Sequence, residues 1–205
     1  MKSRPLKLQS FALFLASALL AAAPALANSA YDSTNLHLMS TNASLNQTLN
    51  SSQLSVGQRV TAHLTMKLRT SDGMLLPRNT QLLGKVSELR NGHGKRTGVA
   101  LVFNRARLKD GRVIPIKATL LGAMPPNEEG SSDYGNYFPD TSKPVSPKAQ
   151  MDQEAGVLSH IALHSAVQSH NSGIFLSKRK DIRLRAGTQL RIAIAPLQSA
   201  STQAS

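Results

Sequence analysis

The sequence predicts a mainly β protein: an antiparallel small barrel or sandwich of roughly six to eight strands, with one helix-containing insertion. Three observations support this prediction: strict alternation of apolar and polar residues in one stretch, an Asp-Gly phrase that occurs twice, and turn residues at short intervals. Short strands joined by tight turns are typical of antiparallel sandwiches and barrels.

The alternation is clearest between residues 59 and 69, where every second residue is apolar and the residues between are polar or charged. This is the pattern of a strand with one buried face and one wet face. Residues 99–103 form instead a continuous apolar run, which predicts a strand buried on both faces.

The repeated phrase indicates two related hairpins. Residues 72–77 read Asp-Gly-Met-Leu-Leu-Pro, and residues 110–115, 38 positions later, read Asp-Gly-Arg-Val-Ile-Pro. Asp-Gly favours a tight hairpin turn because glycine adopts positive φ without a Cβ clash. Each phrase is followed by Leu-Leu-Gly, and glycine inside a strand, as at Gly84, predicts a β-bulge or a bend.

The chain divides into four predicted segments. Residues 1–27 have the basic start, apolar stretch and Ala-Leu-Ala end of a secretory signal peptide that is cleaved. Residues 28–54 are predicted as a polar N-terminal arm, residues 55–197 as the β domain, and residues 198–205 as a disordered tail. With no cysteine on the chain, we expect an exported protein of the bacterial periplasm or one associated with the outer membrane.

The insertion is predicted at residues 125–177. Its first half is rich in Pro, Gly, Ser and acidic residues and is predicted as flexible, and residues 151–171 are predicted as a helix. The apolar face of that helix, with Val157, Ile161 and Leu163, is a candidate docking element for a partner.

Basic residues dominate the charged side chains of the chain, and the formal net charge is +13. Candidate binding residues are four cations expected to face outward from strands: Arg105, Arg107, Arg183 and Arg185. Their partner would be anionic, but the same cations could instead protect strand edges from pairing with other chains. The scarcity of aromatic residues among the basic strands argues against nucleic acid, because single-strand binders stack bases on such residues.

Signs of catalysis are few. His160 and His164 lie four positions apart, which on a helix would place two imidazoles on one face, but a zinc site needs three or four ligands. The chain has no nucleophile elbow, no paired carboxylates in the β core and no phosphate-binding glycine loop. The sequence therefore predicts neither a catalytic centre nor a cofactor, and His160 and His164 remain weak metal-ligand candidates.

The β core resembles a known group. Residues 56–62 and 76–86, followed by 99–103, Leu108-Lys109-Asp110-Gly111 and 114–116, are similar to secreted bacterial β proteins of unknown function. More distantly, they are similar to the C-terminal β-barrel domain of TrbI-like scaffold proteins of conjugation and type IV secretion. The resemblance covers roughly residues 55–124 and 180–197, and the Gly-Thr-Gln-Leu at 187–190 matches the closing strand of that domain.

This resemblance implies a barrel fold and a place in an envelope assembly. The chain departs from the family pattern in having Asn79 where the family has glycine, and Lys109 where it has proline. We therefore expect an exported, non-enzymatic envelope protein that binds or scaffolds envelope proteins or other anionic components, with an oligomer as one form. The alternatives are a metal-dependent hydrolase at His160 and His164, and a binder of an anionic envelope polymer.

Overall fold

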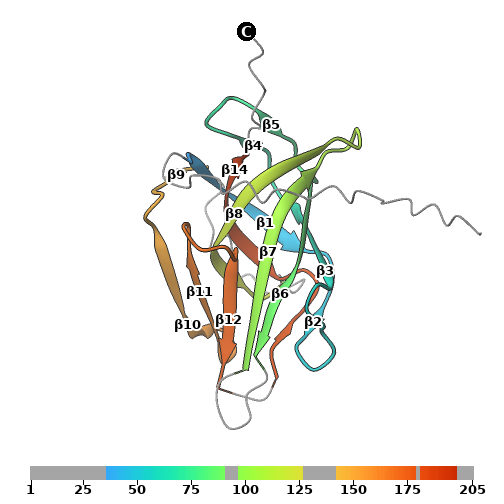
Figure 1. Ribbon diagram of the computed structural model, residues 1–205, viewed down its shortest axis with the longest axis vertical. Coiled ribbons are helices and arrows are strands. Elements are labelled where there is room, and N and C mark those ends of the chain that lie inside the picture. Colours follow the sequence, from blue (N-terminus) through green and yellow to red (C-terminus); the bar gives the residue numbers. More distant parts are fainter. Residues whose placement is uncertain (1–35, 91–96, 127–141, 179–180, 198–205) are drawn as a thin grey trace, which may run out of the picture. The chain divides into compact units, whose positions relative to one another are not determined.

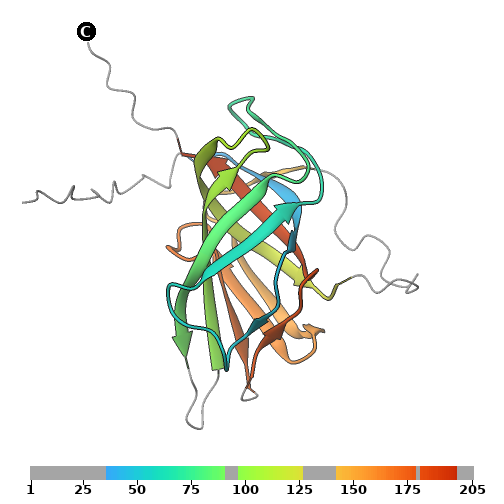
Figure 2. The ribbon, with the colours of Figure 1, turned by 90° about the vertical axis from the view of Figure 1, so that its right-hand side faces the viewer.

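Six antiparallel strands close into a barrel in the computed structural model, which describes residues 36–90, 97–126, 142–178 and 181–197 (Figures 1 and 2). Each strand is hydrogen-bonded to the next in the order β7–β6–β3–β1–β14–β8, and β8 pairs back with β7. The barrel strands are β1 (Leu38–Leu45), β3 (Arg59–Leu64), β6 (Gln81–Arg90), β7 (Thr97–Arg107), β8 (Val113–Met124) and β14 (Gln189–Pro196). The mainly β prediction is thus confirmed, and of the two predicted architectures the structure is the barrel.

The two predicted hairpins are also confirmed. The first is formed by the short strands β4 (Leu68–Arg69) and β5 (Leu75–Leu76), and the second joins β7 to β8. The bulge predicted at Gly84 is present, because the register of β6 on β7 shifts between Leu83 and Gly84.

The polar segment predicted as an N-terminal arm is, from residue 38 onward, part of the barrel. Strand β1 lies between β3 and β14, and its inward-facing Ala43 and Leu45 are fully or almost fully buried. Beyond it, β2 (Leu49–Asn50) pairs with β13 (Arg183–Leu184), and β9 (Pro144–Val145) pairs with the start of β1. Residues 28–35 of the arm, the signal peptide and the C-terminal tail lie outside the described residues.

The predicted helix at residues 151–171 is wrong. These residues form β10 (Gln150–Leu158) and β11 (Ile161–Ala166), which continue through β12 (Gly173–Ser177) onto β7, and no described residue is helical. The apolar positions fitted a helical period, but Ile161 and Leu163 are also two residues apart and both point into the core. A short run that fits both periods does not distinguish a helix from a strand.

Strands β10 and β11 are joined by a two-residue turn, Ser159-His160. Ser159 and His160 have φ values of 40° and 73°, and two successive residues with positive φ form the type I′ turn of a two-residue hairpin. The pair lacks the Asn-Gly or Asp-Gly that usually marks this turn, so the turn was not predicted from the sequence.

Replacing this pair with the preferred residues, as Ser159→Asn together with His160→Gly, is expected to raise the free energy of unfolding by about 1 kcal/mol. The control makes the same replacements at an exposed pair outside this turn, as Lys143→Asn together with Pro144→Gly, and should lower the free energy of unfolding. Denaturant titration of the two double variants measures both effects, and a loss of stability from the turn variant would contradict the turn geometry.

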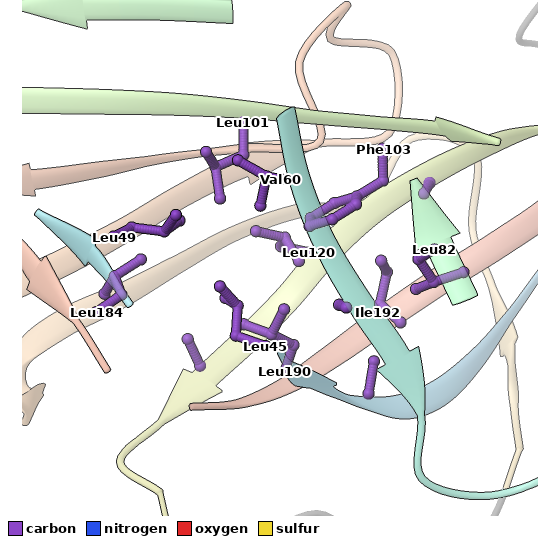
Figure 3. Close-up of a cluster of buried hydrophobic side chains, with 14 of the residues drawn as sticks. Leu45, Leu49, Val60, Leu82, Leu101, Phe103, Leu120, Leu184, Leu190 and Ile192 are labelled. Atoms are coloured by element: carbon purple, nitrogen blue, oxygen red, sulfur yellow. The ribbon is translucent and has the colours of Figure 1, made fainter. Parts of the chain in front are cut away.

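The barrel interior is filled by apolar side chains from every wall (Figure 3). Phe103, Leu120 and Ile192 approach each other from β7, β8 and β14, and all three are at most 1% exposed. Burial of this apolar surface is the main stabilising contribution to the fold. The described part of the barrel therefore encloses a hydrophobic core.

One seam of the structure is held by side chains in place of a strand ladder. Where β7 and β8 separate, the three-stranded sheet β10–β11–β12 lies between them. The Gln153 side-chain amide on β10 donates to the Ala123 carbonyl and accepts from the Ala123 N–H on β8, both at 2.7 Å. The Gln153 side chain thus bonds the N–H and carbonyl of Ala123 as the backbone of a neighbouring strand would. The Lys117 ammonium donates to the Ser169 carbonyl across the same seam, and burial lowers the pKa of Lys117.

Ser172 lies at the fork between β7 and β8. Its N–H donates to the Leu101 carbonyl and its carbonyl accepts from the Leu120 N–H, both at 2.8 Å, while its hydroxyl accepts from the Phe103 N–H at 2.9 Å. One residue therefore satisfies backbone groups of both strands at the point where their own pairing ends.

Arg191 lies on the outer face of the barrel wall, but its side chain is covered by neighbouring residues. It is 9% exposed, and its guanidinium donates to the Asn42 side-chain oxygen at 3.1 Å and to the Ser40 hydroxyl at 2.9 Å. The same hydroxyl accepts from the Lys143 N–H at 3.0 Å. Arg191 faces away from the core, as the strand pattern predicts. Its hydrogen bonds to Ser40 and Asn42 join β14 to β1. The segment that begins at residue 142 lies over these bonds.

Candidate anion-binding tips

The repeated phrase builds two matching hairpin tips. We call residues 67–76 tip 1 and residues 105–114 tip 2. In tip 1, the Thr70 N–H donates to the Met74 carbonyl at 2.9 Å, and the Gly73 N–H donates to the Thr70 carbonyl at 3.0 Å. The carboxylate of Asp72 accepts from the Thr70 hydroxyl and from the Met74 N–H.

Tip 2 has the same bonds 38 residues later. The Leu108 N–H donates to the Arg112 carbonyl at 2.9 Å, and the Gly111 N–H donates to the Leu108 carbonyl at 3.1 Å. Gly73 and Gly111 have φ values of 85° and 86°. Only glycine adopts this conformation at low cost, so both turns require it. The sequence repeat is thus also a structural repeat.

Each tip carries two exposed cations at matching positions: Lys67 and Arg69 in tip 1, and Arg105 and Arg107 in tip 2. Lys67 corresponds to Arg105, and Arg69 to Arg107, at the same offset of 38 residues. The Arg69 guanidinium donates to the Gly73 carbonyl at 3.2 Å, within its own tip. In the described part of the chain, no acidic side chain forms an ion pair with any of the four.

The aspartate of tip 2 is paired with a third cation, Arg112. The Arg112 backbone N–H and guanidinium both bond the Asp110 carboxylate, at 3.0 and 2.7 Å, and these bonds lower the pKa of Asp110. Asp110 is therefore an anion matched by Arg112. Tip 2 retains Arg105, Arg107 and Lys109 as exposed cations.

Both tips lie at one end of the barrel. Gln81 on β6 pairs with His63 on β3 and with Arg107 on β7, so the two hairpins start from the same row of residues and extend beyond it. Figures 1 and 2, two perpendicular views, both show the β4–β5 hairpin and the β7–β8 turn at the upper end. The two pairs of cations therefore lie at the same end of the barrel.

The other two predicted binding residues lie elsewhere. Arg183 and Arg185 are exposed, but they precede the start of β14, which pairs with Met124 at the far end of β8 from Val113. The structure thus brings Arg105 and Arg107 together with Lys67 and Arg69, and not with Arg183 and Arg185. The predicted set omitted Lys67 and Arg69, which the 38-residue repeat could have identified.

A further pair of cations lies on the outer face of the barrel wall. Arg59 on β3 is directly opposite Lys85 on β6, and both are exposed. Like charges in directly opposed positions destabilise a sheet. Neither residue belongs to tip 1 or tip 2.

Two of the three predicted docking residues lie in the core. Ile161 and Leu163 belong to the core, so they are not a surface for a partner, and Val157 lies outside the residues whose side chains are described. His160 is in the β10–β11 turn, and His164 on β11 bonds Asp152 on the opposite strand. No group of three or more His, Asp or Glu side chains able to hold a metal occurs among the described residues.

Comparison with known proteins gives no family: no protein-family model matches the chain, and no curated protein matches it. Within the described residues, no helix is long and apolar enough to cross a membrane.

Proposed function

We propose that the protein is an exported, non-enzymatic binding module of the cell envelope that holds an anionic envelope component through tips 1 and 2. The observation that carries this proposal is the duplicated placement of two exposed cations on each tip, without an acidic partner among the described residues. Cations gathered on one end of a molecule create a positive potential that attracts and orients an anionic partner.

Two sequence features support an envelope location. The first is the predicted signal peptide at residues 1–27, together with the absence of cysteine. The second is the resemblance to TrbI-like scaffold domains, from which we infer a role beside other envelope proteins in the periplasm or at the outer membrane. The fold itself is compatible with many functions, so the proposal depends on the tips.

The test measures binding of the exported domain to linear polyphosphate, a soluble polyanion, over a range of salt concentrations. We expect the affinity to fall steeply as salt rises, because each cation–phosphate contact releases a counterion. Replacing the four tip cations with Gln, as Lys67→Gln, Arg69→Gln, Arg105→Gln and Arg107→Gln, should weaken binding by at least about tenfold at low salt.

A matched control removes the same charge from the rest of the surface: Arg59→Gln, Lys85→Gln, Lys178→Gln and Arg183→Gln. We expect this variant to bind within about threefold of the unmodified protein. Equal losses from both variants would show that net charge alone attracts polyphosphate and would contradict a site at the tips. Affinity independent of salt would contradict anion binding.

A further inference from the structure

The tips also expose aliphatic side chains at matching positions. Leu75 is 47% exposed and Val113 is 45% exposed, and each is the fourth residue of the repeated Asp-Gly phrase. The next residue in each phrase, Leu76 or Ile114, instead packs in or against the core. Among the described residues, the other exposed large apolar side chains are Val56 at 63% and Met151 at 37%.

Exposed aliphatic residues beside cations indicate a particular kind of partner. A soluble polyanion gains nothing from Leu75 or Val113, since neither side chain interacts with phosphate or sulfate groups. A lipid surface accommodates both chemistries, because cations contact anionic headgroups while aliphatic side chains enter the boundary with the acyl chains. The duplicated combination therefore fits lipid better than any soluble anion.

The position of the tips fits this partner. Both tips project from one end of the barrel, so a single flat surface can contact them together (Figure 2). The first described residues lie at the same end, since the Ser71 hydroxyl of tip 1 donates to the His37 carbonyl at 3.0 Å. The chain N-terminal to the barrel is consequently joined to the end that carries the tips.

We propose that tips 1 and 2 dock the barrel end-on against an anionic lipid surface, with Leu75 and Val113 inserted among the lipids and the four tip cations on their headgroups. This inference rests on the proposed function and identifies its anionic component as lipid. Two tips engaging one surface also strengthen each other, because binding of the first raises the effective concentration of the second.

The first experiment measures sedimentation with vesicles of equal parts phosphatidylglycerol and phosphatidylcholine, and with vesicles of phosphatidylcholine alone. We expect binding to the anionic vesicles and at least about tenfold weaker binding to the neutral ones. The double variant Leu75→Ser with Val113→Ser should bind anionic vesicles at least about tenfold more weakly and bind polyphosphate within about twofold of the unmodified protein. The control, Val56→Ser with Met151→Ser, should leave vesicle binding unchanged.

A second experiment reports insertion directly. The chain contains no tryptophan, so Leu75→Trp and Val113→Trp each introduce a single fluorescent reporter. We expect a blue shift of the emission on adding anionic vesicles for both tip variants, and no shift for Val56→Trp.

The outcomes separate the two proposals. Polyphosphate binding with vesicle binding that is insensitive to Leu75→Ser and Val113→Ser, or with no blue shift at either tip, would overturn the lipid inference and leave the anion-binding function standing. Equal binding to neutral vesicles would overturn the requirement for anionic lipid. Failure to bind both polyphosphate and anionic vesicles would overturn the proposed function and this inference with it.

Discussion

Replacing Phe103 with alanine is expected to lower the free energy of unfolding by about 4 kcal/mol, because it removes a large side chain from the closed centre of the barrel. Phe103 is 1% exposed and lies among residues from the facing strands β8 and β14 (Figure 3). Strand β14 is hydrogen-bonded to β1 and β8, and β8 is held by β14 on one side, so the barrel has little freedom to collapse onto the cavity. Denaturant titration measures the change.

The neighbouring Asn104 provides the control. It is exposed on the outer face, and Asn104→Ala should change the free energy of unfolding by less than about 0.5 kcal/mol. A cost below about 2 kcal/mol for Phe103→Ala would show that the interior is loosely packed and would contradict the close-packed core described above.

Gly84→Ala is expected to destabilise the protein by about 3 kcal/mol, although it adds one methyl group at a strand position. The new Cβ would meet the Val102 carbonyl oxygen on the adjacent strand and would lie 2.8 Å from the Phe103 ring. A backbone carbonyl inside a sheet cannot move aside without breaking its ladder, so the pairing of β6 with β7 beside Gly84 must deform.

Gly98→Ala makes the matched comparison, because Gly98 lies on the strand adjacent to β6. Its new Cβ would come within 3.1 Å of the end of the Leu176 side chain, which can change rotamer. We expect a cost below about 1 kcal/mol. Thermal or denaturant unfolding of both variants compares them, and similar costs would mean that the close approach at Gly84 is not the limiting contact.

The sequence predicted the hairpins, the bulge and the barrel option because each depends on local chemistry. Asp-Gly determines a turn through the positive φ of glycine. The alternation over residues 59–69 reflects a buried and a wet face, but the single predicted strand is divided in the structure into β3 and β4. The β1 strand was not predicted, because Ser40, Asn42 and Ser44 make its outer face polar and the inner face contributes only a few apolar residues. Its burial comes from strands distant in sequence.

The hairpin of β10 and β11 was misassigned for a related reason. Ile161 and Leu163 fit two periods, and the turn at Ser159-His160 lacks the residues that usually mark it. The candidate site was predicted in part: Arg105 and Arg107 were identified from their strand. Lys67 and Arg69 join them only because the fold brings the two copies of the repeat to the same end of the barrel.

The side-chain seam has a mechanical consequence. Near the tips, the barrel wall is continuous backbone ladder through six strands, whereas at the other end three more strands are joined to β8 through Gln153, Lys117 and Ser172. Local opening is least costly where few backbone bonds must break. The barrel is therefore stiffer at the end that carries the tips than at the end where β10, β11 and β12 join β8. We expect local opening between β8 and these strands to leave the geometry of the tips unchanged.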